Sequence, residues 1–264
     1  MRTTRRNGGS RRKAGFTLVE LLVVIGIIAL LVSILLPALN KARMQAAMVK
    51  CQSNMRQLML GVNTYASENK TQLPWCNWGG VNDNTVYGYG WLFARPDKRA
   101  SYLPLYTGTP EKAVISGVMW QYMKDTRMYH CPLDDAPVRL GTNVMTSYLM
   151  NGAQCGYGKL GTSGNSPNVP GLRSVQLKHP ADYVLLWEVI EPGVGPLKLS
   201  GAPWNDGASQ PAEESLSSRH YQGANVACVD GHVEWWDQSE WHKWVVFPQP
   251  NGRLWWSPFS TNGH

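Results

Sequence analysis

The 264-residue sequence is poor in charge and lacks the short motifs that mark common catalytic sites. Asp, Glu, Lys and Arg make up only 16% of the chain, and it contains no G-x-S-x-G sequence, no HExxH sequence and no phosphate-binding glycine-rich loop. These absences remove the sequence evidence for a serine hydrolase, a zinc protease of that type or a nucleotide hydrolase. We therefore do not expect the protein to be an enzyme.

Acidic residues are missing from the first 15 positions, which hold nearly all of the basic excess. The formal net charge is +7, and six positive charges precede residue 15, so the rest of the sequence carries only +1. A nucleic-acid-binding domain would instead spread Lys and Arg over a folded surface. We therefore expect a short basic leader and no nucleic-acid partner. The six basic residues are Arg2, Arg5, Arg6, Arg11, Arg12 and Lys13.

A long apolar run follows the leader. The run from Phe16 to Leu36 contains 21 residues and one charge, Glu20. About 20 apolar residues at ~1.5 Å each cross a bilayer core of ~30 Å. A secretory signal has an apolar region of only about 7–15 residues, followed by a small-residue cleavage site that is not evident here. The run predicts one transmembrane segment over 16–36, with its N-terminus cytoplasmic because positive charge precedes it.

The single acid in this run needs a partner. A carboxylate at the bilayer centre costs several kcal/mol, about 2.5–3.5 kcal/mol on insertion scales, and is usually paired. A cut between Gly15 and Phe16 would create an ammonium about one helical turn from Glu20. The carboxylate could then pair with its own N-terminal amine or with that of a neighbouring subunit.

The segment KAGFTLVELLVVIGIIALL resembles the prepilin-type cleavage and methylation motif of type IV pilins and type II secretion pseudopilins. The resemblance implies cleavage between Gly15 and Phe16, N-methylation of Phe16 and a docking role for Glu20. Pro37 matches a proline often found just past the apolar run. The implied partners are a prepilin peptidase and methylase, other pilin-like subunits and an inner-membrane assembly platform.

This resemblance gives the leading functional hypothesis, a structural subunit of a type II secretion or type IV pilus-like filament. The alternative is a membrane-anchored module that binds an extracellular carbohydrate or another polymer through its tryptophans. Such aromatic residues suit carbohydrate stacking and protein interfaces. Most of the 12 tryptophans are better interpreted as core or as seals over it, since the chain has only four phenylalanines.

Helical spacing continues beyond the apolar run. A stripe of residues recurs at three- and four-residue steps, and the sequence SENKTQLP then breaks the pattern near residues 67–69. We predict one helix over 16–69, whose second half packs on a globular head. The stripe comprises Met44, Met48, Cys51, Met55, Leu58, Val62 and Tyr65.

The head, residues 70–264, has short β-like runs between turn signals. ADYVLLWEVI and ANVACVDGHVEWW are the clearest strands, and the second predicts a hairpin with its turn at Asp230-Gly231. The stretches 77–90 and 152–171 are rich in glycine and asparagine and predict surface loops. The expected fold is α+β and pilin-like, with the long N-terminal helix packed on an antiparallel β-sheet head. Residues 1–15 form a removed leader.

The hairpin also carries a resemblance. His220, nine further residues and Asp230-Gly231 resemble the H-X9-DG element near the C-terminus of a pilin-like subfamily, within a hairpin near 220–236. The sequences YHCPLD (129–134) and SYLMNG (147–152) are similar to mid-chain elements of the same proteins.

The sequence offers two candidate metal sites, one for zinc and one for calcium. His220, Asp230 and His232 are close in sequence, but the turn between them favours a hydrogen bond from His220 across the loop over a zinc site. The resemblance to pseudopilins implies calcium instead, which those proteins often bind in a C-terminal loop. The candidate ligands are Asp206, Asp230, Glu234 and Asp237, although no D-x-D-x-D-G spacing occurs. No other cofactor is expected.

The five cysteines fall into two groups. Cys51 lies on the helical stripe and is interpreted as a buried free thiol or small apolar filler. Four others lie in the exported head, where disulfides can form, and the sequence leaves all three pairings open. These are Cys76, Cys131, Cys155 and Cys228.

Overall fold

The computed structural model describes residues 17–77, 88–95, 110–134, 145–156, 172–189, 207–211, 215–246 and 252–256. It divides the chain into two compact units, residues 1–44 and 45–264. Helix α1 (Leu18–Glu68) has residues in both units and ends where the sequence pattern predicts.

In the first unit, the helix consists almost wholly of exposed apolar side chains. All large hydrophobic residues from Leu18 to Leu39 are exposed, and Pro37 lies inside the helix without ending it. The segment is long and apolar enough to cross a membrane. A helix that is hydrophobic on all sides must be covered by lipid or protein, which agrees with the predicted membrane segment.

In the second unit, the same helix is amphipathic. The predicted stripe is confirmed at Cys51, Met55, Leu58 and Val62, which are all buried, whereas Tyr65 is half-buried. Residues three and four apart share one face of a helix, so one face enters the head and the other stays in solvent. The buried positions of the helix are Cys51, Asn54, Met55, Leu58, Met59, Gly61, Val62 and Ala66.

The head contains a five-stranded sheet in the order β5-β3-β4-β6-β7. The predicted antiparallel pairing is confirmed for β3-β4, β4-β6 and β6-β7, but β5 pairs with β3 in parallel, so the sheet is mixed. A two-residue strand gives too weak a pattern for its direction to be predicted. The strands are β3 (Tyr148–Asn151), β4 (Val184–Glu188), β5 (Ala208–Ser209), β6 (Gly223–Cys228) and β7 (Val233–Asp237).

The predicted hairpin is strands β6 and β7. Its turn includes Asp230 and Gly231, and Gly231 has a φ of 103°, a conformation that glycine adopts without a Cβ clash. The Gly231 N–H donates to the Cys228 carbonyl over 2.9 Å. The strand bounds differ from the predicted ones by no more than two residues.

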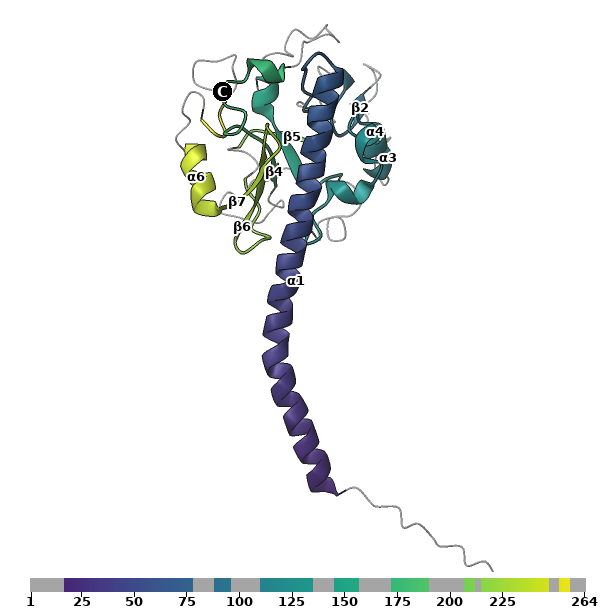
Figure 1. The fold of residues 1–264 in the computed structure, drawn as a ribbon, viewed down its shortest axis with the longest axis vertical. Helices are drawn as coiled ribbons and strands as arrows, with labels where there is room; N and C mark the ends of the chain where they lie inside the picture. Colours follow the sequence, from purple (N-terminus) through teal and green to yellow (C-terminus); the bar gives the residue numbers. More distant parts are fainter. Residues whose placement is uncertain are drawn as a thin grey trace, which may run out of the picture. The chain divides into compact units, whose positions relative to one another are not determined.

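Each face of the sheet has its own core. One cluster joins α1 to Tyr148, Leu186 and Ala227, and the other joins Trp187 and Val226 to the residues of α6 (Gln238–Val246). Neighbouring residues of a strand point to opposite faces, so each strand serves both cores. Figure 1 shows the head portion of α1 between the sheet and helices α3 (Pro110–Ile115) and α4 (Trp120–Met123).

Smaller elements complete the described part of the head. They are a two-stranded sheet, β1 (Gly88–Tyr89) with β2 (Ala94–Arg95), and three 3₁₀ turns: η1 (Thr126–Tyr129), η2 (Gly152–Cys155) and η3 (Ser174–Gln176). The prediction of a surface loop over 152–171 is wrong at η2, whose residues are all buried. The Asn151 side chain accepts from the Ala153 N–H over 2.9 Å and so caps this turn within the core. The surface loop predicted over 77–90 is also wrong at its ends, because Asn77 and Gly90 are buried and Gly88–Tyr89 form β1. Residues 78–87 and 157–171 lie outside the described residues.

The tryptophans confirm the core interpretation. The tryptophans between residues 235 and 256 form a C-terminal cluster. Four of them are buried (Trp236, Trp241, Trp255 and Trp256), Trp244 is half-buried and Trp235 is 36% exposed. Within the described part of the chain, the cluster therefore offers no row of exposed rings on which a sugar polymer could stack.

The packing of α1 gives a matched pair of substitutions. Leu58 is fully buried, whereas Leu60 on the same helix is 68% exposed. We expect Leu58→Ala to lower the free energy of unfolding by about 2–5 kcal/mol, because it leaves a cavity in the core. Leu60→Ala should change it by less than about 0.5 kcal/mol. Urea unfolding of the detergent-solubilised chain, followed by tryptophan fluorescence, tests both, and equal losses would contradict this packing.

Candidate functional site

The N-terminus of α1 is closed by a reciprocal pair of side chains, Thr17 and Glu20. Glu20 Oε2 accepts hydrogen bonds from the Thr17 N–H (2.8 Å) and hydroxyl (2.7 Å), while the Glu20 N–H donates to Thr17 Oγ1 (3.3 Å). This is a capping box, which satisfies backbone donors at the start of a helix. The T-x-x-E spacing is its sequence signal, so Glu20 has a local structural role besides the predicted role in docking. Gly15 and Phe16 lie outside the described residues.

A second group of polar side chains lies inside the head, on the sheet face that meets α1. Tyr148 is the partner of Glu188 across β3 and β4, and Asn225 of β6 donates its backbone N–H to Glu188 Oε2 over 3.1 Å. All three residues are fully buried. The strand register therefore places a hydroxyl, a carboxylate and an amide in one row on the α1 side.

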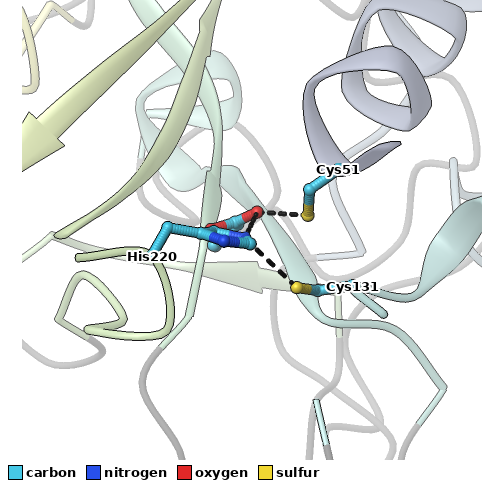
Figure 2. Close-up of side chains that lie close together, drawn as sticks. Cys51, Cys131 and His220 are labelled. Atoms are coloured by element: carbon cyan, nitrogen blue, oxygen red, sulfur yellow. Dashed lines mark hydrogen bonds and ion pairs between the residues drawn. The ribbon is translucent and has the colours of Figure 1, made fainter. Parts of the chain in front are cut away.

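Three further side chains converge on this row. The Cys51 thiol donates to Glu188 Oε1, and its sulfur lies 3.1 Å from the Tyr148 hydroxyl. His220 Nε2 lies 3.3 Å from Glu188 Oε1 and 3.3 Å from Cys131 Sγ. Figure 2 shows Cys51, Cys131 and His220 pointing toward a common centre. We call Cys51, Cys131, Glu188 and His220 the buried cluster.

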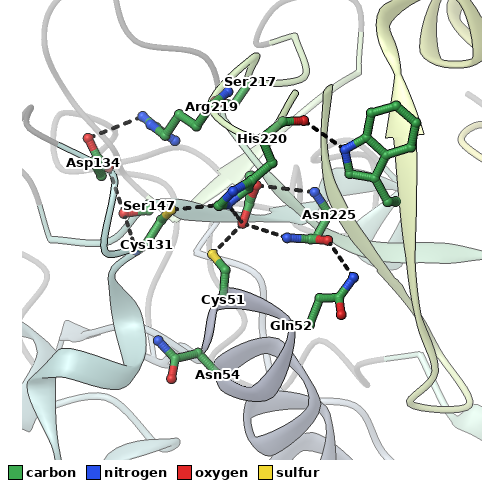
Figure 3. Close-up of polar contacts among 12 residues, drawn as sticks. Cys51, Gln52, Asn54, Cys131, Asp134, Ser147, Ser217, Arg219, His220 and Asn225 are labelled. Atoms are coloured by element: carbon green, nitrogen blue, oxygen red, sulfur yellow. Dashed lines mark hydrogen bonds and ion pairs between the residues drawn. The ribbon is translucent and has the colours of Figure 1, made fainter. Parts of the chain in front are cut away.

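Hydrogen bonds and an ion pair surround the buried cluster (Figure 3). The Asn225 side-chain amide donates to Glu188 Oε1 (3.2 Å) and accepts from Gln52 (3.1 Å). Beside Cys131, Ser147 Oγ accepts from the Cys131 N–H (2.8 Å) and donates to Asp134 (2.6 Å). The members of the cluster are thus held in place by side chains from several elements.

The Asp134 carboxylate forms an ion pair with Arg219. Arg219 Nη2 lies 3.2 Å from Asp134 Oδ1, and both side chains are almost fully buried. Arg219 also donates to the Val189 carbonyl over 2.9 Å. This ion pair fixes the backbone next to His220 and beyond the end of β4.

The members of the buried cluster change one another's ionisation. Burial raises the pKa of the Cys51 thiol, whereas the hydrogen bond from Cys51 lowers the pKa of Cys131 to about 6. Burial alone would lower the pKa of His220, but its hydrogen bonds to Cys131 and Glu188 raise it to about 9. Burial likewise acts to raise the pKa of Glu188, but the His220 hydrogen bond and charge hold it below its usual value. The positive charge of the His220 imidazolium therefore stabilises the Glu188 carboxylate and the Cys131 thiolate.

The structure separates the residues of the H-X9-DG element. The His220 N–H donates to the Gly223 carbonyl over 2.9 Å, a local backbone contact, and the predicted hydrogen bond of His220 across the loop stays a prediction. Its imidazole enters the buried cluster, which the sequence did not predict. Asp230 and His232 lie at the hairpin turn, where Asp230 Oδ1 is 2.7 Å from His232 Nδ1.

The three described calcium candidates have different partners. Asp230 and Glu234 flank the His232 ring, with Glu234 Oε1 2.7 Å from His232 Nε2. Asp237 instead caps α6, because its Oδ1 accepts from the Glu240 N–H over 2.8 Å. Calcium at these residues stays a prediction, and Asp206 lies outside the described residues.

The positions of the four cysteines in the head show which of them are close enough to pair. Cys76 Sγ lies 2.9 Å from Cys155 Sγ, so among the three pairings left open by the sequence the fold brings these two together. Cys228 belongs to the core on the other face of the sheet, and Cys131 belongs to the buried cluster. None of the five forms a disulfide in this structure.

Glu188 is the member of the buried cluster that the sequence analysis missed. Its signal is a carboxylate at the end of the apolar run VLLWE, where full burial demands a partner. For Cys51 the helical stripe predicts a buried free thiol or a small apolar filler, because such a stripe shows burial but does not show which groups a side chain contacts.

Residues 10–36 match the family model of the prokaryotic N-terminal methylation motif. The matched segment includes Gly15, Phe16 and Glu20, the three residues on which the prepilin resemblance rests. It does not extend to residues 220–231, so the H-X9-DG resemblance stays a prediction. No curated protein and no solved structure matches the chain.

The ion pair between Glu234 of β7 and Arg253 lets us predict how the stability of the fold changes at low pH. Arg253 Nη2 lies 2.6 Å from Glu234 Oε1. Burial opposes ionisation, but hydrogen bonds from Arg253, Trp236 and His232 lower the pKa of Glu234 to about 2 from its ordinary 4.5. The ionised carboxylate therefore contributes stability that is fully present above pH 4.5 and is lost as the pH falls toward 2. We expect the free energy of unfolding, measured by urea titration of the full chain, to fall across this window.

Two substitutions test the assignment of this acid sensitivity. Glu234→Gln should flatten the loss of stability with pH, because the titrating group is gone. Arg253→Gln should make the loss smaller and confine it to a narrower window below pH 4.5, because without the guanidinium the pKa of Glu234 in the folded protein rises toward its ordinary value. Identical pH profiles in the wild type and both variants would contradict the assignment.

Proposed function

We propose, from the premise that this chain is a prepilin-type N-terminal methylation protein, that it is a structural filament subunit and not an enzyme. The filament would be of the type II secretion or type IV pilus kind. The observation that carries the proposal is the methylation motif at residues 10–36, continued by a helix whose apolar side chains are exposed. The motif implies a prepilin peptidase and other pilin subunits as partners.

Membrane insertion follows from the distribution of charge. The basic leader would stay in the cytoplasm, the segment 16–36 would span the inner membrane and the head would be exported. Since cleavage precedes Phe16, the apolar segment would stay on the mature subunit, whereas a secretory signal is removed.

Assembly into a filament would then cover the exposed apolar side chains of the helix. Side chains such as Leu18, Ile34 and Leu35 are more than 60% exposed in the single chain. Packing of these helices in a filament would cover that surface by contacts with other subunits. Glu20 would find its positive charge in an N-terminal amine, which offsets the cost of its burial.

The mature N-terminus tests the processing step. We expect the mass spectrum of the protein from its native membrane to show a chain that begins at Phe16 and carries one methyl group on the amine. Gly15 would then be the last residue of the released leader. A native chain that begins at Met1, or that lacks the apolar segment, would contradict the proposal.

Substitutions at Glu20 separate docking from helix capping. Glu20→Gln keeps an oxygen that can accept from Thr17 but removes the charge. We expect this variant to be cleaved normally and yet to be depleted at least tenfold in sheared filaments, measured by immunoblot against the membrane fraction. Leu60→Ala, at an exposed position of α1 beyond the apolar segment, is the control and should assemble. Normal assembly of Glu20→Gln would show that charge pairing is not its role.

A further inference from the structure

Four buried side chains in the head carry the donor atoms of a tetrahedral metal site. We propose that Cys51, Cys131, Glu188 and His220 bind one zinc ion. This site is independent of the N-terminal motif, and it is distinct from the calcium site that the sequence predicted at the hairpin. All four residues are at most 2% exposed, and their donor atoms all lie within 4.8 Å of one another.

The spacing of the donor atoms suits zinc without rearrangement of the backbone. Zinc bonds of about 2.0–2.3 Å in a tetrahedron place the ligand atoms about 3.3–3.8 Å apart. His220 Nε2 is 3.3 Å from both Glu188 Oε1 and Cys131 Sγ. Cys51 Sγ is in hydrogen-bond contact with the same Glu188 oxygen. Small rotations of the side chains would open the centre for one ion.

The chemistry of the donors selects the class of ion. Two thiols and an imidazole favour a borderline-soft ion such as zinc, whereas calcium and magnesium require a shell of oxygen atoms. Four protein ligands fill a tetrahedral zinc site and leave no position for substrate or water. The site would therefore be structural.

Outer contacts already orient the ligands. Glu188 accepts from the Asn225 N–H and side-chain amide, and the Tyr148 hydroxyl lies 3.1 Å from Cys51 Sγ. Such contacts to metal ligands fix their orientation and tune affinity for the ion. Two thiolates and one carboxylate would leave a net charge of −1 around Zn²⁺, which these neutral donors stabilise.

An ion here would join segments that are far apart in the sequence. Cys51 lies on α1, Cys131 follows η1, Glu188 ends β4 and His220 precedes β6. A bond from each to one ion would fix the helix to the sheet, so that the binding free energy contributes directly to folding of the head.

One of the four proposed ligands lines a pocket. A pocket of about 400 Å³ is lined by Cys131 together with Asn54, His130 and Met145. The pocket therefore borders the Cys131 side of the buried cluster. The remaining lining residues are Lys50, Val114, Thr126, Arg127 and Pro132.

Metal content is the first test. The full-length chain, purified in detergent without chelators or metal-affinity resin, should contain one zinc per chain by inductively coupled plasma mass spectrometry. Cys51→Ser/Cys131→Ser should lose it. The matched control is Cys76→Ser/Cys155→Ser, which also removes two neighbouring buried thiols and should keep the zinc. Absence of zinc from the wild type, or a Cys51–Cys131 disulfide in non-reducing peptide maps of the native protein, would overturn the proposal.

A second test avoids variants that fail to fold. Tyr148→Phe keeps the ring and removes the hydroxyl beside Cys51, so zinc affinity in a chelator competition should fall roughly 10–100-fold. Tyr129→Phe is the control, because the buried Tyr129 hydroxyl has no hydrogen-bond partner among the described residues. Cobalt added to the reduced, metal-free chain should give a thiolate-to-cobalt charge-transfer band and the intense visible bands of a tetrahedral ion. Unchanged affinity in Tyr148→Phe, or cobalt bound without these bands, would overturn the assignment.

Discussion

Burying the carboxylate of Glu188 costs several kcal/mol unless charge and hydrogen bonds replace the lost water, and the head is arranged to meet that demand. The imidazole of His220, the amide of Asn225 and the thiol of Cys51 all reach the same carboxylate. These partners come from the segment before β6, from β6 and from α1. Satisfying one charge therefore fixes how the helix sits on the sheet within the head, because a shifted helix would leave the carboxylate without a donor.

The two faces of the sheet differ in polarity, although the same strands form both. On the α1 face, alternation along β4 and β6 presents Glu188 and Asn225 to polar partners. On the other face, Trp187 lies 5.3 Å, centroid to centroid, from Trp241 of α6, in a core without a buried charge pair among its described members. The apolar face supplies stability through burial of large rings, while the polar face sets the register of helix and strands.

The distribution of apolar side chains on helix α1 changes along its length, and each part suits a different environment. Up to Leu39 its large apolar side chains are exposed around the whole helix, as lipid or a bundle of identical helices requires. From Cys51 onward its apolar residues keep to one face, as packing on a globular head requires. A single chain can therefore be retained in a membrane and still carry a water-soluble head. Glu20 interrupts the first pattern, and its capping of Thr17 gives the isolated helix a partner for the acid before any neighbour is present.

The sequence by itself determined the features that depend on local spacing. The length of the apolar run, the end of α1 at Glu68, strand β4 and the β6–β7 hairpin all follow from periodicity and turn residues within a few positions of each other. Tertiary structure alone decided which distant side chains meet. Cys51 and Glu188 are 137 positions apart, and Cys76 and Cys155 are 79 apart. The parallel pairing of β5 with β3 joins Met150 to Ala208, which are 58 positions apart. No local pattern encodes such contacts, because they arise only when the core closes and burial forces each polar group to find a partner.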